Sequence, residues 1–291
     1  MTAVDIRSRM RRTRPFPTRQ VLHTIANHAV AIVVALCFLL PFLIVALTSL
    51  MTEHQAGTGS LWPRHWAWHN FGDVFTAMPF ARDLWNTVLY AGLSTIGVVL
   101  SSVPVAYALA RLQWHGREAV MMLILATMML PTAVTSVSLY SVYVNLGWVG
   151  SLKPLIVPMF FGDPFSIFLL RQFLRTIPTE LTDAARVDGC SEFGIMMRIV
   201  VPLMRPALVA VSLFTLVYTW NDFFTPLVYS GSNSGSWTLT VGLSQFTTLQ
   251  RGALYNMQMA GTLLMMLPII VVFLLAQRAF VEGIKLTGAK G

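Results

Sequence analysis

The chain has 291 residues, of which 55% are hydrophobic and 11% charged, and its mean hydropathy is +0.66. A soluble domain of this length carries roughly a quarter charged residues, so these charges are too few to cover a surface that faces water. The net charge of +8 could suggest nucleic acid as a partner, but the basic residues crowd the segments between long apolar blocks. That distribution is typical of a membrane protein and excludes a phosphate-binding face.

Six apolar blocks are long enough to cross a bilayer, which takes about 20 helical residues. The sequence therefore predicts an all-α, polytopic integral membrane protein with six transmembrane helices. Residues 1–25 would form a basic N-terminal tail, 26–281 the transmembrane domain and 282–291 a C-terminal tail. The first block has no small-residue cleavage signal after it, so we expect a retained helix instead of a signal peptide. The expected spans are 26–50, 84–110, 119–143, 155–173, 207–229 and 255–281.

The positions of Lys and Arg predict the orientation in a bacterial plasma membrane. If both termini are cytoplasmic, sixteen of the 20 basic residues lie on the cytoplasmic side and four lie outside. Because basic residues concentrate on the cytoplasmic side of membrane proteins, we expect this orientation. The four outer residues are Arg64, Arg82, Lys153 and Arg251.

The expected outer segments differ in character from the cytoplasmic ones. The first contains Trp62, Trp66 and Trp68, which most simply anchor the protein in the lipid interface; docking of an external partner is the second interpretation. The segment Gly231–Ser236 reads as a flexible polar loop, for which a plain connection and a docking site are equally favoured.

No constellation of side chains indicates catalysis or metal binding. Cys37 lies in an apolar block and Cys190 in a basic loop, so they form neither a disulfide framework nor a metal site. The six histidines lie at or outside the ends of the apolar blocks, apart from His28 near the start of the first block. We therefore expect no catalytic residue, no metal and no cofactor in this chain, which argues against an intramembrane enzyme.

The basic segment 176–206 between the fourth and fifth blocks carries the most information. Pro178 and Gly189 bound a short predicted helix, and Gly189 is expected in a left-handed conformation. Its apolar stripe contains Ile177, Leu181, Ala184 and Ala185. Half of that face is alanine, which is too small to hold a membrane surface and suits close docking into a cleft of a protein partner. Ser191 would cap a second helix that ends near Pro202 and Pro206.

Asp183-Ala184-Ala185, followed by Gly189 and by Ile199 to Pro202, resembles the EAA loop of permease subunits in type I ATP-binding-cassette importers. Asp183 stands where that family usually has Glu. The runs Ile177–Leu181 and Ala185–Gly189 are similar to those of maltose-type carbohydrate permeases. Three further stretches agree with that family: Ala106–Arg111, Trp220–Asp222 and Gln277–Gly291.

This resemblance implies the type I importer permease fold and a coupling helix seated in a separate ATPase subunit. It also implies as partners a homologous second permease subunit, two ATPase subunits that bind ATP and Mg, and an extracytoplasmic sugar-binding protein. The chain lacks the Gly-x4-Gly-Lys-Ser/Thr phosphate loop, so the ATPase would be a partner. The residues implied in coupling are Glu180, Asp183, Ala184, Ala185, Asp188, Gly189 and Pro202.

Asn221 and Asp222 are candidates for a substrate path, because they fall inside the fifth expected span. An ionised Asp at the bilayer centre costs roughly 2.5–3.5 kcal/mol, so it normally faces a wet cavity or a partner. Trp220 could stack on an apolar sugar face. Equally, Asn221 and Asp222 could bond to backbone freed by Pro226, or to the second subunit, and never meet a sugar. Asp163 is a weaker candidate, whose Gly-Asp-Pro setting reads more easily as a turn.

The resemblance favours a mono- or oligosaccharide as substrate, with glycerol-3-phosphate or a related polyol phosphate as the alternative. A phosphate would require Arg or Lys facing the cavity, and the spans hold none away from their cytoplasmic ends. An ion-coupled secondary transporter is disfavoured, because such proteins show internal repeats with acids in matching halves, which this sequence lacks.

Overall fold

The computed structural model describes residues 18–247 and 254–288 of the chain. The arginines of the N-terminal tail up to Arg14, and Arg251, lie outside these ranges. Every regular element in the described part is a helix, which confirms the expected all-α class. Helix α1 begins at Thr18 and α15 runs to Gly288, so the described part of each expected tail is helical.

The elements follow one another with short connections. Three of them, η1, η3 and η4, are 3-10 helices, and η2 is a π-helix. In chain order they are α1 (Thr18–Ser49), α2 (Glu53–Ala56), α3 (Asn70–Ala77), α4 (Phe80–Arg111), α5 (Arg117–Thr127), α6 (Thr132–Asn145), α7 (Lys153–Ile156), η1 (Val157–Phe161), α8 (Pro164–Leu174), α9 (Glu180–Val187), α10 (Glu192–Ile195), η2 (Met196–Val200), α11 (Val201–Leu203), α12 (Arg205–Asn221), α13 (Phe224–Ser230), η3 (Ser234–Ser236), α14 (Leu239–Ser244), η4 (Gln245–Thr247) and α15 (Tyr255–Gly288).

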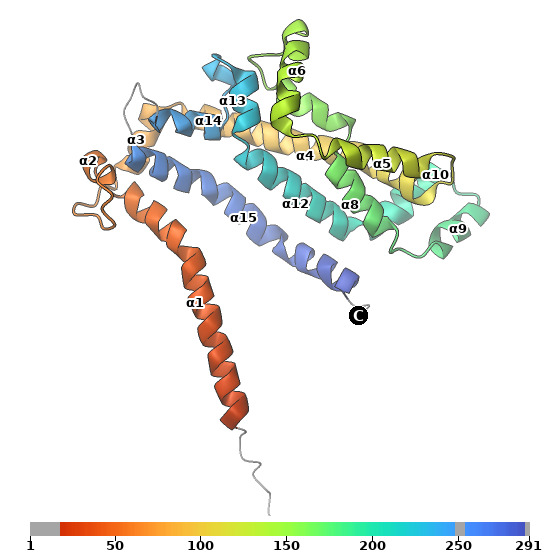
Figure 1. Ribbon diagram of the computed structural model, residues 1–291. Coiled ribbons are helices and arrows are strands. Elements are labelled where there is room, and N and C mark those ends of the chain that lie inside the picture. The colour runs from red at the N-terminus through yellow and green to blue at the C-terminus, as the bar shows by residue number, and fades with distance from the viewer. Residues whose placement is uncertain (1–17, 248–253, 289–291) are drawn as a thin grey trace, which may run out of the picture.

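Helix α4 is the central element of the body (Figure 1). Its 32 residues make a rod about 48 Å long, which exceeds the apolar thickness of a bilayer. It packs against α8 and α12, and also against η1, α7 and α14. Each buried apolar cluster includes a side chain of α4, among them Phe80, Tyr90, Val98 and Leu109. The core of the molecule is therefore built around this helix.

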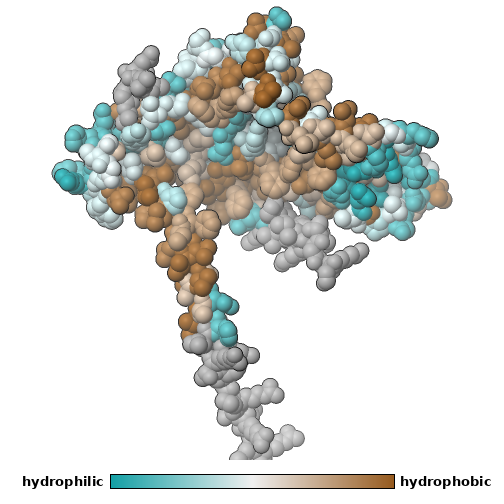
Figure 2. Space-filling model, in the orientation of Figure 1, coloured by the Kyte–Doolittle hydropathy of each residue, from teal (hydrophilic) through white to brown (hydrophobic). Residues whose placement is uncertain are grey.

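Helix α1 departs from the body towards its N-terminal end (Figure 1). Its apolar stretch His23–Ser49 has a mean hydropathy of 3.2 and is exposed over most of its length. Figure 2 shows this helix and the middle of the body as hydrophobic surface, with polar surface towards the two ends of the body. Apolar surface of this extent needs lipid or another subunit around it, as a multi-pass membrane protein has.

Four helical stretches are long and apolar enough to cross a membrane: His23–Ser49, Phe80–Arg111, Lys153–Leu174 and Tyr255–Gln277. They correspond to the first, second, fourth and sixth expected spans. The third reaches that length only as the bent pair Arg117–Thr127 and Thr132–Asn145. The other bent pair joins Glu192–Leu203 to Arg205–Asn221 and so covers only the first part of the fifth expected span. The described residues thus hold four spans, or up to six if each bent pair crosses once.

The third expected span, 119–143, is not one continuous helix. Helices α5 and α6 meet at 95° around a break that ends at Pro131. Proline cannot donate the helical hydrogen bond and disfavours helical geometry in the residue before it, so Pro131 starts a new helix. Pro131 therefore marks the bend between α5 and α6.

The fifth expected span, 207–229, is also divided. Helix α12 ends at Asn221 after 17 residues, and α13 begins at Phe224. Asp222 between them is extended, and its carboxylate accepts a hydrogen bond from the Thr225 amide at 3.2 Å. That bond satisfies a free amide at the start of α13, so Asp222 begins a second helix instead of continuing the first.

The interruption expected in the fourth span is present. The 3-10 helix η1 ends at Phe161, Gly162 follows with φ +104°, and α8 begins at Pro164. Proline suits this first helical position, because the N–H that it lacks has no helical partner there.

The sequence predicted a flexible loop at Gly231–Ser236, but hydrogen bonds hold this segment in place. Arg82 donates to the Ser234 carbonyl at 2.7 Å, and Asn86 donates to the carbonyl of Gly235 at 2.9 Å. Asn233 donates to the Gly150 carbonyl at 2.6 Å. The start of α4 thus fixes a polar loop whose residues 231–235 remain exposed.

Candidate coupling and substrate sites

Helix α9 occupies the segment for which the sequence predicts the coupling helix. It ends in a Schellman motif, in which the Cys190 amide donates to the Ala185 carbonyl and the Gly189 amide to the Arg186 carbonyl, both at 3.0 Å. Gly189 has φ +80°, which confirms the expected left-handed conformation. A Cβ built on Gly189 would meet no atom within 4 Å, so any side chain there is strained by the backbone alone.

The predicted apolar stripe of α9 is divided between two faces. Ala185 is buried, and Ile177 packs against the same core cluster. Leu181 and Ala184 are exposed, and Val187 is 88% exposed. The surface free for a partner is therefore formed by Leu181, Ala184 and Val187. Ala185, expected at the docking face, holds α9 to the body of its own chain instead.

Charged side chains surround the exposed face. Glu180, Asp183 and Asp188 are exposed. Arg186 donates from Nε to Glu192 Oε1 and from Nη1 to Asp183 Oδ1, both at 2.6 Å. The hydrogen bond that Arg186 donates to the Glu192 carboxylate raises the pKa of Arg186 above its ordinary value, so this guanidinium stays charged. Asp183 is thus already engaged within its own chain.

The second helix of the loop starts where the sequence predicts. The Ser191 hydroxyl accepts a hydrogen bond from the Gly194 amide at 3.2 Å, as an N-cap does. The helix continues through the π-turn of η2 to Leu203, and Pro202 lies in its last turn. It then bends by 77° into α12. The loop is therefore joined directly to a helix that lines the cavity described next.

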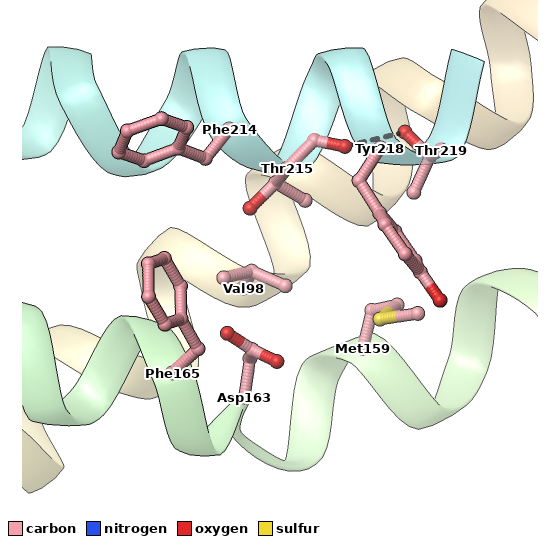
Figure 3. A pocket seen from close by; sticks show the side chains of 8 residues that line it. All are labelled: Val98, Met159, Asp163, Phe165, Phe214, Thr215, Tyr218 and Thr219. Atoms are coloured by element: carbon pink, nitrogen blue, oxygen red, sulfur yellow. Dashed lines mark hydrogen bonds between the residues drawn. The ribbon is translucent and has the colours of Figure 1, made fainter. Parts of the chain in front are cut away.

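A cavity of about 370 Å³ lies between α4, η1, α8 and α12 (Figure 3). The surface of the cavity is mainly apolar, and on α12 it is formed by one stripe that contains Phe214, Thr215, Tyr218 and Thr219. Phe165 of α8 meets Phe214 edge to face, with ring centroids 5.9 Å apart. The other residues that line the cavity are Val98, Met159 and Asp163.

Asp163 both caps a helix, as its Gly-Asp-Pro setting predicted, and lines the cavity. Its Oδ2 accepts hydrogen bonds from the Ser166 amide at 2.8 Å and from the Ser166 hydroxyl at 2.6 Å, so it caps α8. The same half-buried carboxylate faces the cavity (Figure 3). It is the one acidic side chain among the lining residues of the described chain.

Trp220, expected to stack on a sugar, lies in the core. The side chain is 6% exposed, and its Nε1 donates to the Met265 carbonyl of α15 at 3.2 Å. It packs with Leu239 and Leu243 of α14. In this conformation its ring is not available to a substrate, because α12 turns it towards α14 and α15.

Asn221 and Asp222 do not line the cavity either. Asn221 is exposed and donates to the Val217 carbonyl of its own helix at 2.8 Å. Asp222 Oδ2 accepts from the buried Tyr90 hydroxyl at 2.8 Å, while its other oxygen caps α13. These contacts match the structural alternative for Asp222, namely a bond to backbone near Pro226.

The α12 stripe was not predicted as a site, although it directly precedes the predicted triplet Trp220–Asp222. Aromatic residues in an apolar span give no distinct signal. The spacing of Phe214, Thr215, Tyr218 and Thr219 at i, i+1, i+4 and i+5 could have identified one semi-polar helical face.

The arrangement can bind a small neutral molecule by ring contacts and hydroxyl hydrogen bonds. Within residues 18–247 and 254–288, no group of three or more His, Cys, Asp or Glu could hold a metal ion.

Comparison with known proteins identifies the class. Residues 102–286 match the family of binding-protein-dependent transport system inner membrane components. The chain belongs to this family and is a transmembrane permease subunit of an ATP-binding-cassette importer. It is 34% identical to the arabinooligosaccharides transport system permease protein AraQ of Halalkalibacterium halodurans, over 73% of this chain and 74% of AraQ.

Two further comparisons cover more of the chain. It is 29% identical to the melibiose/raffinose/stachyose import permease protein MelC of Bacillus subtilis, over 90% of this chain and 95% of MelC. The fold resembles a permease chain in the crystal structure of a bacterial ABC transporter that imports the acidic polysaccharide alginate. That match has a TM-score of 0.76 and 22% identity, and covers 92% of this chain and 100% of the other.

Proposed function

We propose that the chain moves a neutral mono- or oligosaccharide across the bacterial plasma membrane, with α9 docked in a cleft of a separate ATPase subunit. The observation that carries this proposal is the exposed face of α9. A short amphipathic face formed by Leu181, Ala184 and Val187 suits insertion of a helix into a protein groove. It is fixed at a polar end of the molecule by the Schellman turn at Gly189.

The chemistry of the cavity supports a neutral sugar over a phosphate. Among its lining residues in the described chain there is no Lys or Arg, and Asp163 places a carboxylate on the wall. A phosphate dianion would be repelled there, whereas hydroxyls of a sugar can donate to Asp163 and exchange hydrogen bonds with Thr215 and Tyr218. The names of AraQ and MelC, both oligosaccharide permeases, point in the same direction.

The proposal includes an assembly and an orientation. A homologous permease, two ATPase subunits binding ATP and Mg, and an extracytoplasmic sugar-binding protein would complete the importer. Both termini and segment 176–206 would be cytoplasmic, with Gly231–Ser236 outside. Hydrogen bonds from Arg82 and Asn86 fix the backbone of that loop. This supports a role of the loop as a docking surface for the binding protein, because a preorganised loop loses little entropy on binding.

Docking of α9 is tested by Ala184→Glu. Ala184 is exposed, so the added carboxylate leaves the fold intact, while it obstructs a close-fitting cleft. We expect the membrane-inserted variant to lose the ATPase subunit on co-purification. Ala77→Glu, which changes an exposed alanine of α3 in the same way, is the matched control and should retain it. Retention of the ATPase by Ala184→Glu would refute docking through this face.

A further inference from the structure

The cytoplasmic end of α4 contacts both flanks of the loop that contains α9. Tyr107 and Arg111 are four residues apart and therefore lie on one face of the helix. They belong to the run Ala106–Arg111, whose residues neither line the cavity nor form part of the exposed face of α9.

Arg111 binds the segment that precedes α9. One of its terminal nitrogens, Nη2, donates to the carbonyl of Leu174 at 2.7 Å and to that of Ile177 at 2.6 Å. Leu174 is the last residue of α8, whose final carbonyls have no partner within the helix. Arg111 thus closes α8 and fixes the start of the loop to α4 with two charge-assisted hydrogen bonds.

Tyr107 binds the segment that follows α9. Its hydroxyl donates to Glu192 Oε2 at 2.6 Å, and its ring is buried in the core cluster that includes Ala185. The other oxygen of Glu192 accepts from Arg186, which in turn pairs with Asp183. A continuous chain of hydrogen bonds therefore runs from α4 through α10 to α9.

The short helix depends on such support. Helices of fewer than about 12 residues are marginal in water, and α9 has 8 residues, with one face exposed. The same α4 contributes Val98 to the cavity wall, and through Arg82 it holds the outer loop. If a displacement of the loop that contains α9 is transmitted to α4, it would therefore reach both the cavity wall and the outer loop.

We propose that Tyr107 and Arg111 are positioning residues that fasten the two flanks of the coupling loop to α4, so that loop and helix move as one body when the ATPase acts. This inference rests on the proposed function, and it adds to it a route from the ATPase to the cavity.

The test uses the complete complex of both permeases and the ATPase pair in proteoliposomes. Nitroxide labels are attached at native Cys190, which is exposed, and at Gln113→Cys beyond the end of α4, with Cys37→Ser and cysteine-free partner subunits. Their separation is measured without nucleotide and after trapping with ATP and vanadate. The wild type is expected to give one narrow distance that trapping does not change.

Tyr107→Phe removes only the hydroxyl and leaves the ring in the core. We expect its distance distribution to broaden and to shift on trapping, while ATP hydrolysis persists. Arg111→Met keeps the apolar stem but removes the donors, and should give the same shift between position 113 and a label at Thr179→Cys. Tyr143→Phe, at a buried tyrosine of α6, is the matched control and should behave as wild type.

Unchanged distances in both variants would overturn the proposal, because the loop would then follow α4 without these bonds. Loss of the ATPase together with lower thermal stability would also overturn it, since the residues would then be merely structural. A wild-type chain that binds no ATPase would instead refute the proposed function, and this inference with it.

Discussion

At the scale of single residues, Gly189 imposes a backbone requirement on the proposed coupling loop. With φ +80° and open space around it, a substitution is penalised only by backbone strain. We expect Gly189→Val to cost about 1–2 kcal/mol in the local stability of the loop and to weaken ATPase binding and transport. The measurement is co-purification of the ATPase with the membrane-inserted variant.

Gly72→Ala is the control for this prediction, because Gly72 lies within α3, has ordinary backbone geometry and also has open space around it. It should leave ATPase binding unchanged. Full binding and transport by Gly189→Val would show that the Schellman turn is dispensable.

Asp222 was a candidate for the substrate path because an ionised Asp in the bilayer costs free energy, but its contacts are structural. Asp222→Ala removes the acceptor for Tyr90 and the cap of α13, so we expect a loss of about 1–3 kcal/mol in the free energy of unfolding. The neighbouring Asn221→Ala removes only a bond within its own helix and serves as the control. Thermal unfolding in detergent distinguishes the two; equal midpoints would mean that the Tyr90 contact contributes little.

At the scale of elements, α4 and α14 pack so closely at Gly242 that an added side chain would force its neighbours to shift. A Cβ on Gly242 would lie 2.5 Å from Asp83 Oδ2 and 2.7 Å from Met78 Cε. We expect Gly242→Ala to lower stability by about 1–3 kcal/mol through overpacking. Gly92→Ala in α4, with no atom within 4 Å of the added methyl, should be neutral or stabilising. Thermal midpoints of the purified variants test this, and two equal midpoints would contradict the packing described here.

The elements also show how far sequence reasoning reaches. Hydropathy found all six apolar blocks, and capping rules found the start at Ser191 and the stop at Gly189, because these signals are local. It could not divide the third and fifth blocks, since a proline or an aspartate inside an apolar run fits a kinked span as well as a break. The faces of α9 and α12 were missed because burial of Ala185 and Trp220 depends on α4, α14 and α15, which are distant in sequence.

At the scale of the whole molecule, orientation depends on the distribution of basic residues. We expect Ser234→Cys to react with an impermeant thiol reagent in intact cells, because loop 231–235 is exposed and would lie outside. The native Cys190, also exposed, would lie in the cytoplasm and should react only after the membrane is opened. The reverse pattern would invert the topology and remove α9 from the reach of a cytoplasmic ATPase.

The central claim is that ATP hydrolysed by a partner drives sugar through this permease. The most direct measurement is uptake of radiolabelled raffinose and arabinan oligosaccharides into proteoliposomes that contain the full complex, with ATP inside and the sugar-binding protein outside. The account predicts uptake that requires both ATP and the binding protein, persists when ion gradients are collapsed, and is lost in Ala184→Glu but kept in Ala77→Glu. Uptake that continues without ATP and stops when an ionophore is added would contradict it.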